Sequence, residues 1–208
     1  MKMLKPLLNE RFVRKAASFL QAACWLAICF FALVTVLACL GRQTFTLRTS
    51  TDVYEEAIYA EEDHAWTSRG FTVDSGSDIR VTANSDGGVD LATHIGLTLM
   101  LAAQALPALA GCWLLSRVFA NIAQGRIFVE QNARGLLGYG LLQVYASFVL
   151  PFVKILFSQL SNLVSGSKIT AFSTYTGVDE LFPGIVFLVA AYIIHYGITL
   201  QDEVDHTL

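Results

Sequence analysis

The chain has 208 residues, of which 54% are hydrophobic and only 15% are charged, with a formal net charge of −3 at pH 7. Soluble globular domains carry about 25% charged residues, so this composition excludes an ordinary soluble domain. A helix that crosses the roughly 30 Å hydrocarbon core of a bilayer needs about 20 apolar residues. Several segments of that kind occur, and they predict a multi-pass membrane protein.

Four predicted membrane helices define the fold class, an all-α transmembrane four-helix bundle. They are residues 16–40, 92–115, 136–157 and 181–200. Lys154 is the only lysine, arginine or acidic residue within them. We expect Pro107 and Pro151 to kink the second and third helices, because proline removes a backbone donor.

Residues 1–15 form a basic tail before the first helix. This tail combines basic residues with the apolar residues Leu4, Leu7, Leu8 and Phe12. Two interpretations stay open: a short amphipathic helix that lies on anionic headgroups, or a basic flank that only orients the first membrane helix.

Residues 41–91 are too long for an idle connection. Residues 44–49, 70–74 and 79–83 are rich in β-branched and aromatic residues with alternating polarity, which predicts three strands. Between the first two strands, Asp52 with Glu55 indicates the start of a short helix. We therefore expect a small β-containing cap on the extracytoplasmic side; the alternative is a mobile acidic loop.

The charges predict which side each connection faces, because short cytoplasmic loops are enriched in Lys and Arg. Residues 1–15 and the loop 116–135 are basic and are assigned to the cytoplasm. Residues 41–91 carry four arginines against ten acidic residues, and they are assigned to the outside together with the loop 158–180. The acidic tail 201–208 then lies in the cytoplasm, so both termini of this cell-membrane protein are cytoplasmic.

A polar segment, "ANIAQGRIFVEQNARGL", separates the second and third helices at residues 120–136. Gly125 interrupts the helical pattern and predicts a turn. Phe128, Asn132, Leu136, Tyr139 and Gln143 then recur at helical spacing, which predicts one face of the third helix.

The motif Phe119-x-x-Ile122-x-x-Gly125-Arg126-x-Phe128-x-x-x-Asn132-x-x-x-Leu136 resembles the signature of the domain-of-unknown-function 2975 family of bacterial membrane proteins. The chain's end resembles the same family through Gly197, Leu200, Glu203, Asp205, Thr207 and Leu208. His206 departs from the aliphatic residue expected there. The resemblance implies four helices in the bacterial inner membrane, no established activity, and frequent neighbourhood with small helix-turn-helix DNA-binding proteins.

No motif for catalysis, nucleotide binding or metal binding is present. The four cysteines lie in apolar segments and are expected to pack as small hydrophobes. Gln143, Lys154 and His195 are polar residues within predicted membrane helices, where an ionisable group is a functional candidate. His195, with Gln143 facing it, is either a proton or ligand site or a neutral histidine bonded within the bundle.

We therefore expect a non-enzymatic membrane protein with no cofactor, no metal and no direct contact with nucleic acid. The basic turn (Arg126, Arg134) and the acidic tail (Glu203, Asp205) are predicted to form one cytoplasmic surface. That surface either locks the bundle ends or docks a partner, such as a DNA-binding regulator. The partners foreseen are the lipid bilayer, this regulator and a second copy in a homo-oligomer. The alternative function is a small transporter, channel or accessory subunit.

Overall fold

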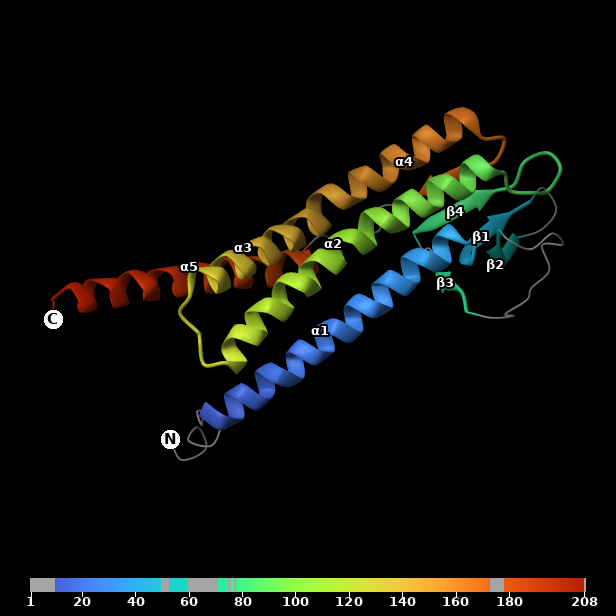
Figure 1. The fold of residues 1–208 in the computed structure, drawn as a ribbon. Coiled ribbons are helices and arrows are strands. Elements are labelled where there is room, and N and C mark those ends of the chain that lie inside the picture. Colours follow the sequence, from blue (N-terminus) through green and yellow to red (C-terminus); the bar gives the residue numbers. More distant parts are fainter. Residues whose placement is uncertain are drawn as a thin grey trace. The chain divides into compact units, whose positions relative to one another are not determined.

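The computed structural model describes residues 10–49, 53–59, 71–74, 76, 78–172 and 178–207. Within this part of the chain, four helices are long and apolar enough to cross a membrane (Figure 1). They are α1 (Glu10–Cys39), α2 (Leu91–Ala123), the continuous helix of α3 (Glu130–Val144), η1 (Tyr145–Val149) and α4 (Leu150–Val164), and α5 (Val178–Thr207). The prediction of four such helices with a strand-containing region is confirmed, and these helices indicate a multi-pass membrane protein.

The helices reach beyond the predicted apolar segments. α2 continues to Ala123 and α3 begins at Glu130, so most of the predicted loop 116–135 is helical. α5 continues to Thr207, so the predicted tail is an extension of that helix. Of the predicted amphipathic tail, residues 1–9 lie outside the described part of the chain, while Phe12 belongs to α1.

The third long helix contains a π-helical turn, η1, just before Pro151. A proline ring collides with the carbonyl four residues earlier, here that of Ser147, and a widened turn relieves this collision. The hydroxyl of Ser147 donates to the carbonyl of Gln143 at 3.0 Å. Pro107 lies inside α2, which is helical from Leu91 to Ala123 without a break.

The sheet contains β1 (Gln43–Arg48), β2 (Val53–Ile58), β3 (Val73–Asp74), β4 (Ile79–Thr82) and β5 (Lys168–Ala171). Its order is β2-β1-β4-β5. The short strand β3 lies off this path: it pairs with the beginning of β1, and β4 pairs with the end of β1. β1 is antiparallel to β2 but parallel to β3 and β4, while β4 and β5 are antiparallel.

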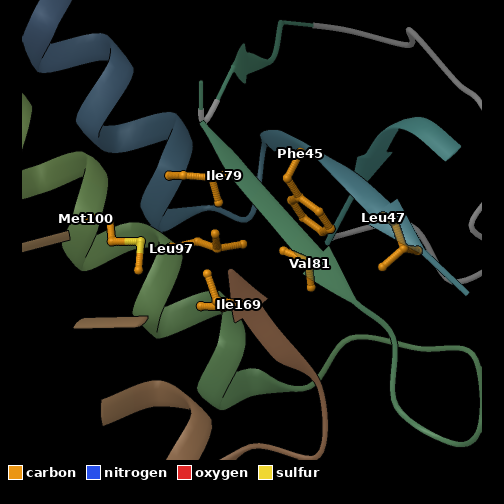
Figure 2. Packing of buried hydrophobic residues seen from close by; sticks show 7 residues of the cluster. All are labelled: Phe45, Leu47, Ile79, Val81, Leu97, Met100 and Ile169. Atoms are coloured by element: carbon orange, nitrogen blue, oxygen red, sulfur yellow. The ribbon is translucent and has the colours of Figure 1, made fainter. Parts of the chain in front are cut away.

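One face of the sheet packs on α2 (Figure 2). Phe45 and Leu47 of β1, Ile79 and Val81 of β4 and Ile169 of β5 surround Leu97 and Met100 of α2. The alternate residues Arg80 and Thr82 are exposed. This alternation is the period-two pattern from which β1 and β4 were predicted.

Two strands in the connections were not predicted. Residues 53–58 form a strand rather than the predicted short helix, because β1 offers an edge with which they pair antiparallel. Within the predicted loop 158–180, residues 168–171 form β5 along β4. In both places the backbone hydrogen bonds of a neighbouring strand outweigh local propensity.

The chain divides into two compact units, which we describe separately. The unit of Phe31–Leu106 and Phe148–Thr176 holds the sheet and the core in Figure 2. The unit of Met1–Phe30, Pro107–Ser147 and Gly177–Leu208 holds a second apolar core. There Val118 of α2, Leu136 of α3 and Ala191 of α5 are buried against one another.

Candidate functional site

The connection between α2 and α3, residues 124–129, begins with a tight helix end. The amide of Gly125 donates to the carbonyl of Ile122, and the amide of Arg126 donates to the carbonyl of Asn121, both at 2.9 Å. This pair of bonds is the Schellman motif, which requires a left-handed residue at its centre. Gly125 supplies it with a φ of 81°, so the predicted turn lies where the glycine indicated.

Asn132 holds this connection in place from the first turn of α3. Its side chain is fully buried. The amide nitrogen donates to the carbonyls of Arg126 and Ile127 at 2.9 and 2.8 Å, and the amide oxygen accepts from Asn121 at 2.8 Å. The three hydrogen bonds of this neutral side chain therefore join α3 to the connection and to the end of α2.

Two arginines lie beside the same turn. The guanidinium of Arg126 donates to the amide oxygens of Asn121, at 3.2 Å, and Gln124. Arg14 of α1 lies against Gly125, where an added Cβ would come within 2.8 Å of its guanidinium. Arg14 is also paired with Glu10 one helical turn earlier. Positively charged side chains therefore gather at this end of the unit, in agreement with the basic composition of residues 116–135.

The tip of the connection carries apolar side chains that are exposed at the surface of its unit. Ile127 is 41% exposed and Phe128 is 44% exposed. Phe128 was predicted to begin the polar face of the third helix, but it precedes α3, so that face begins at Asn132. The Phe128 ring instead packs on α5, where a Cβ at Gly197 would meet it at 2.7 Å.

A second set of contacts joins α3 to α5. Glu130 accepts from Nε of Arg134 at 3.0 Å and lies 3.4 Å from Nδ1 of His195. All three side chains are substantially exposed. The predicted neighbour of His195 was Gln143, and the structure places Glu130 there instead. Gln143 lies further along α3, beside Gly184.

The acidic end of α5 lies beyond the connection rather than against it. Phe128 meets α5 at Gly197, and Glu203 follows six residues later, about 9 Å further along a helix. Figure 1 shows the red end of α5 running past the start of α3. Asp202 and Glu203 are exposed, whereas the side chain of Asp205 lies outside the described part of the chain.

The remaining polar candidates have partners within their own units. Gln143 donates to the hydroxyl of Tyr139 at 2.7 Å. Lys154 forms an ion pair with Asp78 at 2.9 Å, at the turn before β4. Phe119 is half-buried on α2. Among the described residues, no group of three potential metal ligands occurs.

A polar cluster at the start of α2 was not predicted from the sequence. Asp90 accepts from the amide of Thr93, from the hydroxyl of Ser165 and from the amide of Gly166 at 2.6–3.0 Å. Burial opposes ionisation, but these hydrogen bonds outweigh it and hold the pKa of Asp90 below its ordinary value. The carboxylate thereby caps α2 and ties it to the end of α4. The sequence signal for this cluster was the spacing of Asp90 and Thr93, in which an aspartate precedes a helix by the distance of an N-cap.

Comparisons with known proteins agree with the motif found around Gly125. The family model described as "Protein of unknown function (DUF2975)" matches residues 54–208, which include the whole connection and α5. No curated protein and no solved structure matches the chain. Because the family model covers most of the chain, this protein belongs to the DUF2975 family.

Proposed function

We propose that this protein is a membrane-embedded docking protein, without enzymatic activity, that holds a soluble regulator at the cytoplasmic face. The observation that carries the proposal is the construction of the α2–α3 connection. Buried amides fix its backbone, while Arg126, Ile127 and Phe128 are exposed at its tip. An exposed apolar tip on a fixed backbone favours protein binding, since the backbone of the connection needs no further ordering in the complex.

The cytoplasmic assignment is part of this proposal and rests on charge. Arg14, Arg126 and Arg134 gather in the unit that contains the connection. The loop before α2, by contrast, is strongly acidic. Because the Lys/Arg asymmetry sets orientation, the connection and both termini face the cytoplasm and the sheet lies outside. The sheet would then be placed to receive an external signal.

The proposed partner has a basic surface with an apolar patch. Ile127 and Phe128 supply the apolar half of the docking surface, and Asp202 and Glu203 on the α5 extension supply the acidic half. Small DNA-binding proteins carry such basic surfaces. The family resemblance points to a helix-turn-helix regulator in particular, and this protein itself makes no contact with nucleic acid.

Site-specific photocrosslinking in native membranes tests the proposal. A photoreactive residue at Ile127 or at Glu203 should yield an adduct with a soluble, basic DNA-binding protein, identified by mass spectrometry. The same residue at Leu141, which is exposed on the apolar part of α3, is the matched control and should yield no such adduct. An adduct only with a second copy of this chain would replace the proposal by a homo-oligomer.

Substitutions separate docking from the transport alternative. Ile127→Ser, or Asp202→Asn with Glu203→Gln, should reduce capture of the regulator about tenfold, the effect of losing one good interface contact. His195→Ala should leave capture unchanged. If the docking variants capture normally and His195→Ala alone abolishes the cellular function, the transport interpretation is correct instead.

A further inference from the structure

An apolar groove lies between α2 and α4, within the unit that holds the sheet. On each helix the lining residues follow spacings of three, one and three, so each set forms one face of its helix. The two faces extend over about two helical turns, or roughly 10 Å. The groove has a volume of about 260 Å³ and is lined by Ala92, Ile95, Gly96, Leu99, Phe157, Leu160, Ser161 and Val164.

The two helices touch where Gly96 faces Ser161. A Cβ at Gly96 would come 2.7 Å from the hydroxyl oxygen of Ser161. That hydroxyl donates to the carbonyl of Ala92 at 3.0 Å, so the only polar side chain of the lining is already hydrogen-bonded. The lining residues therefore offer a ligand apolar contacts alone.

The groove is open to its surroundings, because several lining residues are exposed. Ile95 and Leu160 are each 50% exposed and Leu99 is 44% exposed. All three belong to helices that are long and apolar enough to cross a membrane, so hydrocarbon surrounds them there. Pockets for small molecules enclose about 300–1,000 Å³. A smaller groove, two turns long and open to hydrocarbon, fits a single acyl chain that enters from the side.

One end of the groove meets the carboxylate of Asp90. Asp90 lies two residues before Ala92, and it accepts a hydrogen bond from Ser165, the residue after Val164. Through Ser165 and Gly166 the carboxylate joins the ends of the same two helices that form the groove. The apolar spans of these helices also end at this level. A lipid whose chain fills the groove therefore has its headgroup near Asp90.

The Asp90 carboxylate is a charge without a counter-charge among the described residues. The amides of Thr93 and Gly166 and the hydroxyl of Ser165 donate to it, and all three donors are neutral. No ion pair in the described part of the chain includes Asp90. Although burial opposes ionisation, these hydrogen bonds hold the pKa of Asp90 below its ordinary value, so the group is charged at neutral pH. The side chain is only half-buried, and a cationic headgroup complements it.

We propose that the groove binds an acyl chain of phosphatidylethanolamine, whose ammonium group lies at Asp90. The ammonium donates to the carboxylate in a charge-assisted hydrogen bond. The headgroup of phosphatidylglycerol has no cation, and the carboxylate repels its negative charge. This headgroup selection distinguishes the site from the lipid that covers every membrane helix. The site is independent of the docking proposal and requires only that α2 and α4 cross a membrane.

Photocrosslinking with lipid probes tests the site. The full-length protein is reconstituted into vesicles of phosphatidylethanolamine and phosphatidylglycerol, with a trace of either lipid carrying a diazirine on its acyl chain. Adducts mapped by mass spectrometry should concentrate at Ile95, Leu99 and Leu160. Leu141, which is 56% exposed on α3, is the matched control and should be labelled less. The phosphatidylethanolamine probe should label the groove about two- to fivefold more than the phosphatidylglycerol probe, the range of one exposed ion pair.

Two variants make the outcome decisive. Asp90→Asn should abolish the preference between the probes, whereas Asp86→Asn should retain it, because Asp86 is an exposed carboxylate in the turn before α2. Since Asp90 also caps α2, Ile95→Trp provides a variant that fills the groove and leaves the carboxylate intact. It should lower labelling of the other groove residues to the level of the control. Equal labelling of the groove by the two probes, a preference kept in folded Asp90→Asn, or groove labelling unchanged by Ile95→Trp would each overturn the proposal.

Discussion

Replacing Asn132 by alanine should release the α2–α3 connection and destabilise the unit that contains it. The side chain is fully buried and makes three hydrogen bonds, two to carbonyls of the connection and one to Asn121. Alanine preserves the helical propensity of α3, since it is the best helix former. The loss therefore reports on the hydrogen bonds rather than on the helix.

The size of the effect follows from what each partner does afterwards. The two carbonyls belong to Arg126 and Ile127, which are exposed, so water can replace each bond at a cost of about 0.5–1 kcal/mol. Asn121 is buried, and its unpaired amide costs about 1–3 kcal/mol. Asn132→Ala should therefore lower the free energy of unfolding by about 2–5 kcal/mol. Asn132→Asp should cost more, because it points a buried carboxylate at two carbonyls.

Unfolding of the purified protein by sodium dodecyl sulfate, followed by circular dichroism, measures the global effect. Hydrogen exchange of the peptide that covers 124–133 measures the local one. Asn162→Ala is the matched control: Asn162 also bonds backbone groups, those of Ile169, but it belongs to the other unit. It should destabilise the protein without accelerating exchange in 124–133.

A double-mutant cycle isolates the bond between the two asparagines. Because Asn121→Ala and Asn132→Ala remove the same bond, the double variant should cost about 1 kcal/mol less than the sum of the singles. The reasoning is refuted if Asn132→Ala costs less than about 0.5 kcal/mol, or if the two substitutions add fully.

Three further substitutions test polar contacts in the other unit. The hydrogen bonds to Asp90 hold its pKa below the ordinary value of about 3.9, so its carboxylate stabilises the fold above that pH and loses this effect as the pH falls further. The stability difference between wild type and Asp90→Asn should therefore shrink between pH 7 and pH 3 in thermal unfolding; a constant difference contradicts this. Gln43→Met should leave stability unchanged or raise it by about 1 kcal/mol, because Oε1 of Gln43 is buried without a hydrogen-bond partner among the described residues; a clear loss in the same assay would show that its 3.5 Å bond to the carbonyl of Leu97 matters. Lys154→Met should cost about 1–2 kcal/mol because it leaves the half-buried Asp78 carboxylate unpaired, and adding Asp78→Leu should recover most of this loss; absence of recovery would show that the unpaired carboxylate is not its cause.

The parts of the fold that could be predicted from the sequence are those set by local pattern. Apolar length revealed the four helices, and alternation revealed β1 and β4. Gly125 marked a turn because a left-handed residue is needed there. Strand β2 and strand β5 were missed because each exists through pairing with a distant strand, β1 and β4 respectively. Short segments of that kind carry little signal of their own.

The candidate site was predicted as a set of residues but not as an arrangement. Asn132 was expected on one face of the third helix, and its bonds back to the connection were not foreseen. Glu130 was not singled out, yet it joins Arg134 and His195. Both sets of contacts were missed because the start of α3 was placed by hydropathy, and hydropathy does not record which end groups of a helix need partners.

The family motif around Gly125 can now be divided by what each residue does. Gly125 provides the left-handed backbone and Asn132 the three bonds that fix the connection, so both act on the shape of the turn. Arg126 and Phe128 contribute exposed side chains on that shape, and Ile127 lies between them at a position that the motif leaves unspecified. The Phe128 ring also packs on α5, which gives it a role within the unit. The exposed part of the tip, held on a backbone that buried amides fix, is the feature on which we base the docking proposal.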